Sequence, residues 1–187
     1  MKKIGLCITG SFCTFSNLLK ALDNLIGAGY DVIPVFSYNV SNLDTRFYKQ
    51  ADFERLIVEK TGKTPVKTIV EAETITKSGI ELMLVAPCTG NTLAKIVGGI
   101  TDTPTTMAVK ATLRTNKPVV LSISSNDALG ANAKNVGIAL NTKNLYLVPF
   151  GQDAPTNKPH SLIADTTLIL PTIEKAFQHE QIQPVIL

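Results

Sequence analysis

The sequence predicts an α/β fold of three layers (α/β/α), in which a parallel, Rossmann-like (flavodoxin-like) sheet lies between two layers of helices. Two observations carry this prediction. Short, continuous apolar runs alternate with segments whose apolar residues recur at helical spacing, as in a parallel sheet covered on both faces. Two of the apolar runs, 3–8 and 80–86, pass directly into turns rich in glycine and hydroxyl groups. Such turns present N–H groups and hydroxyls to phosphates in α/β proteins.

Length and composition indicate one domain, which we expect to span residues 1–187, with 161–187 as a C-terminal helical segment and tail. Of the 187 residues, 44% are hydrophobic and 18% are charged, as in a globular chain with a full-sized core. The net charge of +3 comes from 18 basic and 15 acidic side chains scattered along the chain. This weak and dispersed charge predicts no nucleic-acid partner.

The sequence predicts neither a membrane partner nor a metal site. No apolar run reaches the length of a membrane span, and the basic start 1–3 leads into a strand pattern without a signal-peptide cleavage site. The three cysteines, Cys7, Cys13 and Cys88, form no CxxC pair and have no histidine nearby. We therefore expect a cytoplasmic protein with free thiols.

Apolar periodicity, glycine and proline predict the individual elements. After the strand 3–8 we expect a helix over 12–26 that ends at Gly27 and Gly29. A strand over 32–37 follows, and Pro34 places it near an edge of the sheet, because proline cannot donate to a central ladder. Further strands are predicted over 80–86, 118–122 and 145–149, and further helices over 52–60, 91–97, 105–113, 127–140 and, kinked at Pro171, 161–177. Periodicity leaves open whether 65–70 is a strand or a loop.

The strands 3–8 and 80–86 are expected side by side, where the winding of the sheet reverses direction, because crossover connections are right-handed. Ligands bind at such a point. The turn Thr9-Gly10-Ser11 has one glycine where the dinucleotide fingerprint has three, so it favours a monophosphate over a dinucleotide. The same pattern occurs at helix N-termini that bind nothing, and both interpretations stay open.

The second turn, Pro87 to Thr92, offers the amide of Asn91. An amide donates and accepts at once, which suits the edge of a flavin ring or a substrate carboxylate. Thr89 or Asn91 can equally cap the following helix. We interpret Cys88 and Cys13 as packed thiols, because no histidine close in sequence could activate them.

Several segments resemble the flavoprotein family that includes the homo-oligomeric flavin-containing cysteine decarboxylases. The resemblance covers most of the chain and is carried by Gly10-Ser11, 87–96, 99–102 and 118–121. It implies FMN at the ends of the first, second and 80–86 strands, in trimers or multiples of trimers. The cofactor contacts that it implies are Thr9, Gly10, Ser11, Ser37, Pro87, Thr89, Gly90, Thr92 and Ser124.

Within the family, Arg46-Phe47, 110–114, 125–130 and above all 148–155 resemble a branch that works with a separate subunit. This resemblance implies an oxidoreductase subunit acting in the mother cell of a sporulating bacterium. With an A subunit similar to a pyridine-nucleotide dehydrogenase, and NAD(P) through that subunit, it would form pyridine-2,6-dicarboxylate from a dihydro or hydroxytetrahydro precursor. The same resemblance makes Gln152 and Asp153 candidates for partner-dependent activity.

A small dicarboxylate calls for cations and amides in its pocket. Arg46, Asn91 and Asn126 are the candidate substrate contacts, with Lys95 and Arg114 as further cations for which a solvated position is the simpler interpretation. Asn91, Asn126 and Asp127 are the candidate catalytic residues. Asp127 is the nearest carboxylate base, and it is equally suited to cap a helix.

Two alternatives stay open. Decarboxylases of the family use a catalytic histidine and a Pro-x-Met-Asn motif, whereas His160 and His179 fall late in this chain and only Asn126 of the motif persists. An FMN-dependent decarboxylase or prenyl-flavin-type enzyme is therefore the runner-up. The other alternative is a non-catalytic structural subunit with a vestigial pocket.

Overall fold

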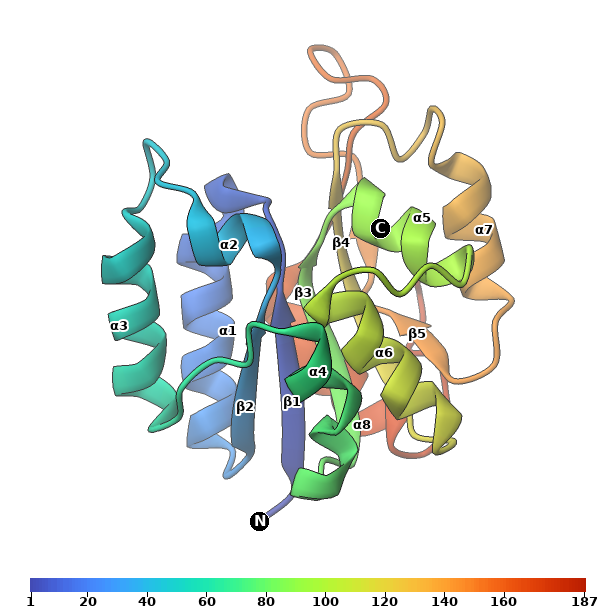
Figure 1. Ribbon diagram of the computed structural model, residues 1–187. Helices are drawn as coiled ribbons and strands as arrows, with labels where there is room; N and C mark the ends of the chain where they lie inside the picture. The colour runs from blue at the N-terminus through green and yellow to red at the C-terminus, as the bar shows by residue number, and fades with distance from the viewer.

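The computed structural model describes residues 1–187 and places a seven-stranded sheet between two layers of helices (Figure 1). Five strands are parallel and follow the order β2-β1-β3-β4-β5. They are β1 (Lys3–Ile8), β2 (Asp31–Phe36), β3 (Leu82–Cys88), β4 (Val119–Ser125) and β5 (Leu145–Leu147). Leu6 of β1 pairs with Leu84 of β3, which confirms that these two strands are neighbours.

The strand β2 lies at an edge of the sheet, as Pro34 predicts. Its outer side meets a single residue, Val66, whose N–H donates to the Pro34 carbonyl at 2.9 Å and whose carbonyl accepts from Phe36 at 2.9 Å. The segment 65–68 is therefore a loop with one isolated bridge to the sheet, and residues 69–70 already belong to a helix.

Helices cover both faces of the sheet (Figure 1). On one face, α1 (Phe15–Gly27) and α8 (Ile169–Ala176) pack together, and Phe15 stacks on Phe53 of α3 (Gln50–Thr61) with ring centroids 4.3 Å apart. The short α2 (Tyr38–Asn42) follows the end of β2. The other face carries α4 (Ile69–Glu73), α5 (Gly90–Val97), α6 (Pro104–Arg114) and α7 (Ala133–Leu140). Every residue of β3 is buried, as a central strand between two helical layers requires. No helix combines the length and apolar character that crossing a membrane demands.

Two expected helices begin later than predicted. The helix expected from residue 12 opens with the 3-10 turn η1 (Phe12–Thr14) before α1. The helix expected over 127–140 begins only at Ala133, because the side chains of Ser125 and Asn132 both bind the carboxylate of Asp127 and hold this stretch in turns.

The sequence predicts that the C-terminal segment is helical from residue 161. This prediction is wrong, because the segment begins as a strand. The strand β7 (Leu162–Ala164) pairs antiparallel with the end of β4 and with β6 (Phe150–Gly151). We call β6, β7 and the loop 152–161 between them the arm. Pro171 is the third residue of α8, where its missing N–H leaves no intrahelical bond unmade. Two 3-10 turns, η2 (Ile75–Ser78) and η3 (Thr166–Leu168), complete the element order.

Candidate functional site

The two glycine-containing turns lie together at the carboxyl ends of β1 and β3, and Thr9 joins them. Its hydroxyl donates to the carbonyl of Pro87 at 2.7 Å and accepts from the N–H of Thr89 at 3.1 Å. Thr9 is buried, so its hydroxyl is committed to holding the two turns at a fixed separation.

A first hollow of about 240 Å³ opens beside the first turn. The hydroxyl oxygen of Ser11 lies 2.8 Å from that of Ser124 near the end of β4, so the ends of β1, β3 and β4 all contribute to it. The predicted contacts Gly10, Ser11, Thr89, Gly90, Ser124 and Asn126 line this hollow, together with Cys13 and with Asp153, Lys158 and Ser161 from the arm.

A second hollow of about 390 Å³ adjoins the first and shares Gly10 and Thr89 with it. Ser37 lies in this second hollow, where its hydroxyl accepts from the N–H of Val40 at 3.3 Å and caps α2. Ser11 therefore lines one hollow and Ser37 the other, and the two hollows share Gly10 and Thr89. The other predicted residues that line the second hollow are Thr9, Asn91, Thr92 and Lys95.

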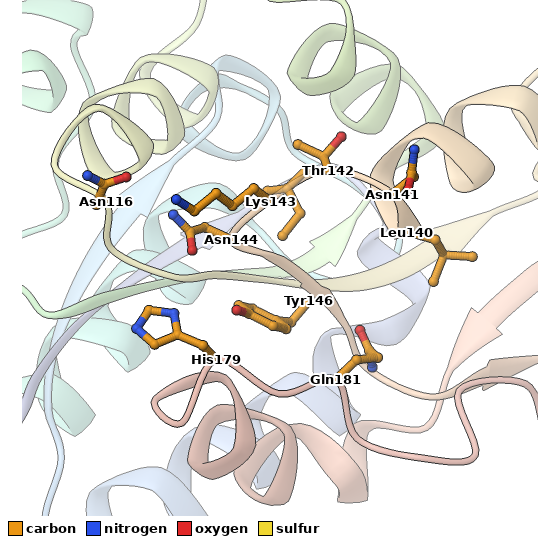
Figure 2. A pocket seen from close by; sticks show the side chains of 10 residues that line it. Asn116, Leu140, Asn141, Thr142, Lys143, Asn144, Tyr146, His179 and Gln181 are labelled. Carbon is orange, nitrogen blue, oxygen red and sulfur yellow. The ribbon is translucent and has the colours of Figure 1, made fainter.

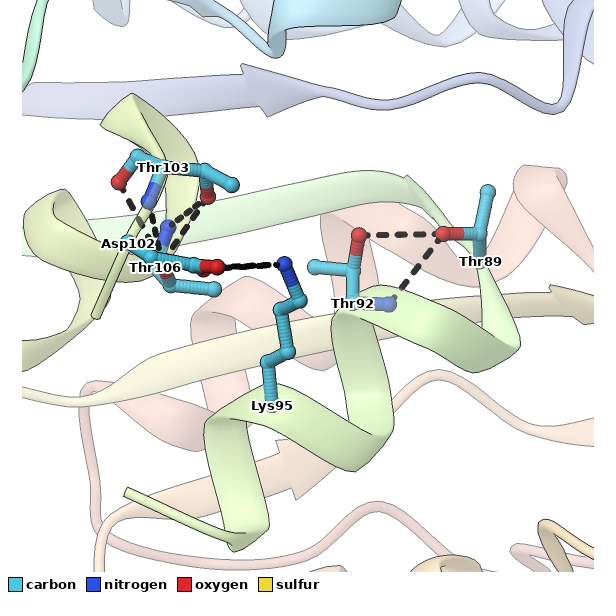
Figure 3. Close-up of polar contacts among 6 residues, drawn as sticks. All are labelled: Thr89, Thr92, Lys95, Asp102, Thr103 and Thr106. Carbon is cyan, nitrogen blue, oxygen red and sulfur yellow. Dashed lines mark hydrogen bonds and ion pairs between the residues drawn. The ribbon is translucent and has the colours of Figure 1, made fainter. Parts of the chain in front are cut away.

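The start of α5 leaves two backbone donors open to the hollows. Thr89 is the N-cap: its hydroxyl oxygen accepts from the N–H of Thr92 at 3.3 Å and lies 2.9 Å from the Thr92 hydroxyl (Figure 3). The N–H groups of Gly90 and Asn91 have no intrahelical acceptor, because the first donors of any helix are unpaired. Open N–H groups at a helix N-terminus favour an anion.

Lys95 is the one cation that lines the second hollow. Its Nζ lies 2.9 Å from both carboxylate oxygens of Asp102, just before the capping box that Thr103 and Thr106 form at the start of α6 (Figure 3). The Lys95 side chain is only 23% exposed. The structure therefore gives Lys95 a fixed place beside the hollow, in contrast to the solvated position expected from the sequence.

Lys158 is the one cation that lines the first hollow, and sequence reasoning missed it. Its Nζ lies 3.6 Å from the carboxylate of Asp153. A hydrogen bond from Ser161, with Lys158 nearby, holds the pKa of Asp153 below its ordinary value. Sequence reasoning missed Lys158 because it did not identify the strand β7. With residues 161–177 interpreted as a helix, no predicted element places Lys158 next to the sheet.

Asp127 lies in a network of hydrogen bonds beside the hollows and lines neither of them. Its carboxylate accepts from the Ser125 hydroxyl at 2.5 Å and from the Asn132 amide at 2.8 Å. These bonds lower the pKa of Asp127, which makes it a weak proton acceptor near neutral pH. A Cβ on Gly90 would lie within 2.8 Å of the same three side chains, so α5 packs directly on this network.

The remaining candidates are spread over the site. Asn126 lines the first hollow and Asn91 the second. Arg46 is exposed in the loop after α2, with its guanidinium 4.8 Å from the ring centroid of Phe47, and it lines neither hollow. The three candidate substrate contacts are therefore not brought together in this structure.

Cys88 and the two histidines line neither hollow, whereas Cys13 lines the first. Cys88 is buried, and burial raises the pKa of its thiol to about 12. Neither His160 nor His179 lines either hollow, and no group of three or more His, Cys, Asp or Glu side chains is placed to hold a metal ion.

The fold and the site define a Rossmann-like α/β protein with a polar, anion-compatible site at the carboxyl ends of its parallel strands. The family described as Flavoprotein matches residues 1–138. The chain belongs to this family.

Two relatives are similar over nearly their whole length. The B subunit of dipicolinate synthase from Bacillus subtilis (strain 168) is 43% identical over 186 residues, which cover 99% of this chain and 93% of that protein. The crystal structure of the B subunit of dipicolinate synthase from Bacillus halodurans C superimposes with a TM-score of 0.91 at 40% identity, covering 100% and 96% of the two chains. These are the proteins whose branch the 148–155 segment resembles.

A more distant structure shares the fold. The FMN-dependent cysteine decarboxylase SpaF superimposes with a TM-score of 0.67 at 19% identity, covering 96% of this chain and 97% of that one. The likeness shows that the two proteins share a fold.

The lining of the two hollows fits a phosphate-bearing, hydroxyl-rich cofactor such as FMN. The open N–H groups of Gly90 and Asn91 suit an oxyanion, and the hydroxyls of Ser11, Ser37 and Ser124 suit the phosphate and a polyol chain. The combined hollows reach the range of roughly 300–1,000 Å³ that is typical of ligand pockets.

Proposed function

We propose that the chain is the B subunit of a dipicolinate synthase, an FMN-binding oxidoreductase subunit that acts with a separate A subunit to form dipicolinate (pyridine-2,6-dicarboxylate). The observation that carries this proposal is the 43% identity to the B subunit of a dipicolinate synthase over 99% of the chain. The A subunit would contribute NAD(P). By the same resemblance, we place the activity in the mother-cell cytoplasm of a sporulating bacterium.

The cofactor would lie across the rim of Gly10 and Thr89 that the two hollows share. Ser11 and Ser124 would bind it from the first hollow, and Ser37 and Thr92 from the second. Bound FMN supplies a two-electron acceptor, so that a dihydropyridine can become aromatic by losing a hydride and a proton. The protein contributes binding, orientation and exclusion of water.

The substrate would lie on the arm side of the rim, in the first hollow. Lys158 is the cation there and Asn126 the amide, which together can bind a carboxylate through charge and through a hydrogen bond. In the second hollow, Lys95 and Asn91 form a similar pair. Asp127 would act as a positioning residue, because its hydrogen bonds with Ser125 and Asn132 fix the turn that carries Asn126.

The decarboxylase alternative receives less support from the site. The family resemblance implies a catalytic histidine for that reaction, whereas neither hollow is lined by one. An oxidation that relies on a bound flavin needs no such group in the protein.

The proposal is tested with this protein and a separately purified A subunit. After FMN is added and the excess removed by gel filtration, we expect this protein to stay yellow, with the visible absorption of oxidised flavin. Dipicolinate formation, followed by its ultraviolet absorption, should require both proteins. Full activity of the A subunit alone would contradict the proposal, and a colourless protein that still activates the A subunit would favour the structural-subunit alternative.

We also propose that the protein forms a trimer or a multiple of a trimer. Ile100 follows the Gly98-Gly99 pair at the C-terminal end of α5 and is 50% exposed, which places an apolar side chain at the surface. Light scattering at micromolar concentration should give a mass that is a multiple of three subunits, and Ile100→Asp should lower it. A monodisperse monomer would contradict this assembly.

A further inference from the structure

The arm places a carboxylate and an ammonium group side by side in the first hollow. The Nζ of Lys158 lies 3.6 Å from a carboxylate oxygen of Asp153, and both side chains line this hollow. The second hollow is lined by Lys95 and by no carboxylate. Asp153 is therefore the only carboxylate that lines the candidate site.

A third hollow, of about 830 Å³, lies at the N-terminal ends of β4 and β5 and provides a contrast (Figure 2). Lys143 and His179 line it, and no carboxylate does. The helices α6, α7 and α8 end beside this hollow, and their carbonyl ends favour cations there. Among the three hollows, only the first combines a cation with a carboxylate.

Two hydrogen bonds fix the loop 152–161 that carries this pair. The side-chain amide of Gln152 donates to the carbonyl of Pro159 at 2.9 Å and closes the loop on itself. The N–H of Leu129 donates to the carbonyl of His160 at 2.9 Å and ties the loop to the turns between β4 and α7. The pair is therefore presented to the hollow by a loop that is held at both of these points.

Asp153 is ionised near neutral pH and can accept one more hydrogen bond. Ser161, which is 3% exposed, donates to its carboxylate, and this bond, with Lys158 nearby, holds the pKa of Asp153 below its ordinary value. An ionised carboxylate has about four acceptor sites on its two oxygens and no donor. Ser161 and Lys158 take two of these sites, so Asp153 can accept from a ligand and cannot donate to it.

The pair calls for a ligand that carries an acceptor and a donor on one edge. A carboxylate suits Lys158 and the amide of Asn126. Asp153 calls for an N–H beside that carboxylate, because a lone pair placed there would face a negative charge. In a reduced pyridine-2,6-dicarboxylate with a ring N–H, the nitrogen is bonded to the carbon that bears the carboxylate, so both groups lie on the same edge. The aromatic ring presents a nitrogen lone pair at that place.

We propose that Asp153 is the specificity-determining residue of the first hollow: it accepts a hydrogen bond from the ring N–H of a reduced dicarboxylate and disfavours the aromatic one. The inference rests on the function proposed above and adds how the site distinguishes precursor from product. Asp153 binds the N–H and is not the base, since its pKa is lowered. Loss of the ring hydrogen removes this contact, which favours release of the product.

Two flat probes that carry the same two carboxylates test this discrimination. The ring nitrogen of dipicolinate has no hydrogen, whereas the 4-oxo-1,4-dihydro analogue of dipicolinate has a ring N–H between its carboxylates. With FMN present and divalent cations absent, isothermal titration calorimetry should show that the 4-oxo probe binds about tenfold or more tightly than dipicolinate. Equal affinity for the two probes, or no binding of either, would overturn the proposal.

Asp153→Asn keeps the shape of the side chain and removes its charge. The new amide can donate to the ring nitrogen of dipicolinate and accepts less strongly than a carboxylate. Dipicolinate should therefore bind more tightly and the 4-oxo probe more weakly, so that the preference falls about tenfold. A structural role alone would weaken both probes alike, and this result would overturn the proposal.

Two further variants serve as controls. Lys158→Gln should weaken both probes and keep the preference between them, because both carry the carboxylate that it binds. Glu59→Gln, at an exposed carboxylate of α3, should change the affinity for neither probe.

This inference and the proposed function can fail separately. If the mixture with the A subunit forms no dipicolinate while Asp153→Asn still abolishes the preference between the probes, the proposed function fails and the specificity of the hollow stands. If dipicolinate forms and Asp153→Asn leaves the preference unchanged, the inference fails and the proposed function stands.

Discussion

The hydroxyl oxygens of Ser11 and Ser124 lie 2.8 Å apart, although 113 positions separate the two residues in the chain. Ser11 follows β1, Ser124 lies near the end of β4, and β3 runs between these strands, so the contact spans the end of β3. Each hydroxyl can turn its second hydrogen-bonding site toward a ligand. The pair therefore offers a polyol or a phosphate two adjacent hydrogen-bonding groups, one from the turn after β1 and one from the end of β4.

Replacing Ser11 tests this pair. Ser11→Ala should weaken FMN binding by about 1.5–3 kcal/mol, roughly ten- to over a hundredfold, because it removes a hydrogen bond to a charged or strongly polar ligand. Fluorescence titration of FMN measures the change. Ser16→Ala, on the exposed side of α1, is the matched control and should bind FMN as the unchanged protein does. Equal affinities for the two variants would remove Ser11 from the site.

Gly90 tests the packing of α5 on the Asp127 network. A Cβ there would lie 2.5 Å from the Ser125 hydroxyl oxygen and 2.8 Å from a carboxylate oxygen of Asp127, so Gly90→Ala should destabilise the fold by about 1–3 kcal/mol. Urea unfolding provides the measurement. Gly137→Ala on α7 meets no atom within 4 Å and should instead stabilise the fold by about 0.5–1 kcal/mol. If both variants gain stability, α5 and the network are not in contact as described.

The lowered pKa of Asp127 predicts how its contribution to stability depends on pH. The hydrogen bonds from Ser125 and Asn132 hold the folded-state pKa below the unfolded value of 3.8. The ionised carboxylate therefore stabilises the fold above about pH 4, and this contribution is lost as the pH falls through the folded-state pKa.

Comparison with Asp127→Asn isolates this contribution from those of other acidic groups. The unchanged protein should be more stable than the variant at pH 7, and the difference should shrink below about pH 4. Unfolding curves over this range give the answer. A stability difference that stays constant with pH would show that the charge of Asp127 is irrelevant.

Lys158 tests the placing of the substrate. In a mixture with the A subunit, Lys158→Gln should raise KM for the substrate about tenfold or more, because the first hollow loses its only lining cation. Its ion pair with Asp153 is open to solvent, so the melting temperature should stay the same. Lys134→Gln is the control for a general loss of charge. An unchanged KM would assign the substrate to the second hollow or to the A subunit.

Much of the framework could be predicted from the sequence because its signals are local. Pro34 identifies an edge strand by the chemistry of one residue, and the turns after β1 and β3 follow directly from apolar runs. The arm could not be predicted. β6 has two residues and β7 three, and such short strands exist only through their pairing with each other and with β4.

The same difference explains which of the residues that line the hollows could be named from the sequence. The turns that follow two predicted strands contain Ser11, Thr89 and Asn91. Their position in the sequence was therefore enough to predict that they lie at the ends of those strands. Lys158 reaches the first hollow only through the antiparallel arm, and its neighbours in sequence carry no motif. The late start of α7 has a similar cause, since the bonds of Asp127 to Ser125 and Asn132 compete locally with helix formation.

The strand β4 belongs to two structures at once. Its residues 119–121 pair with β5 inside the parallel sheet, whereas Ser124 and Ser125 pair with β7 in the arm. The arm is thus joined to the sheet along a seam only two residues wide, and the Ser124 side chain at that seam touches Ser11. A ligand that contacts both Ser11 and Ser124 would therefore bind at the junction between the parallel sheet and the arm that carries Lys158.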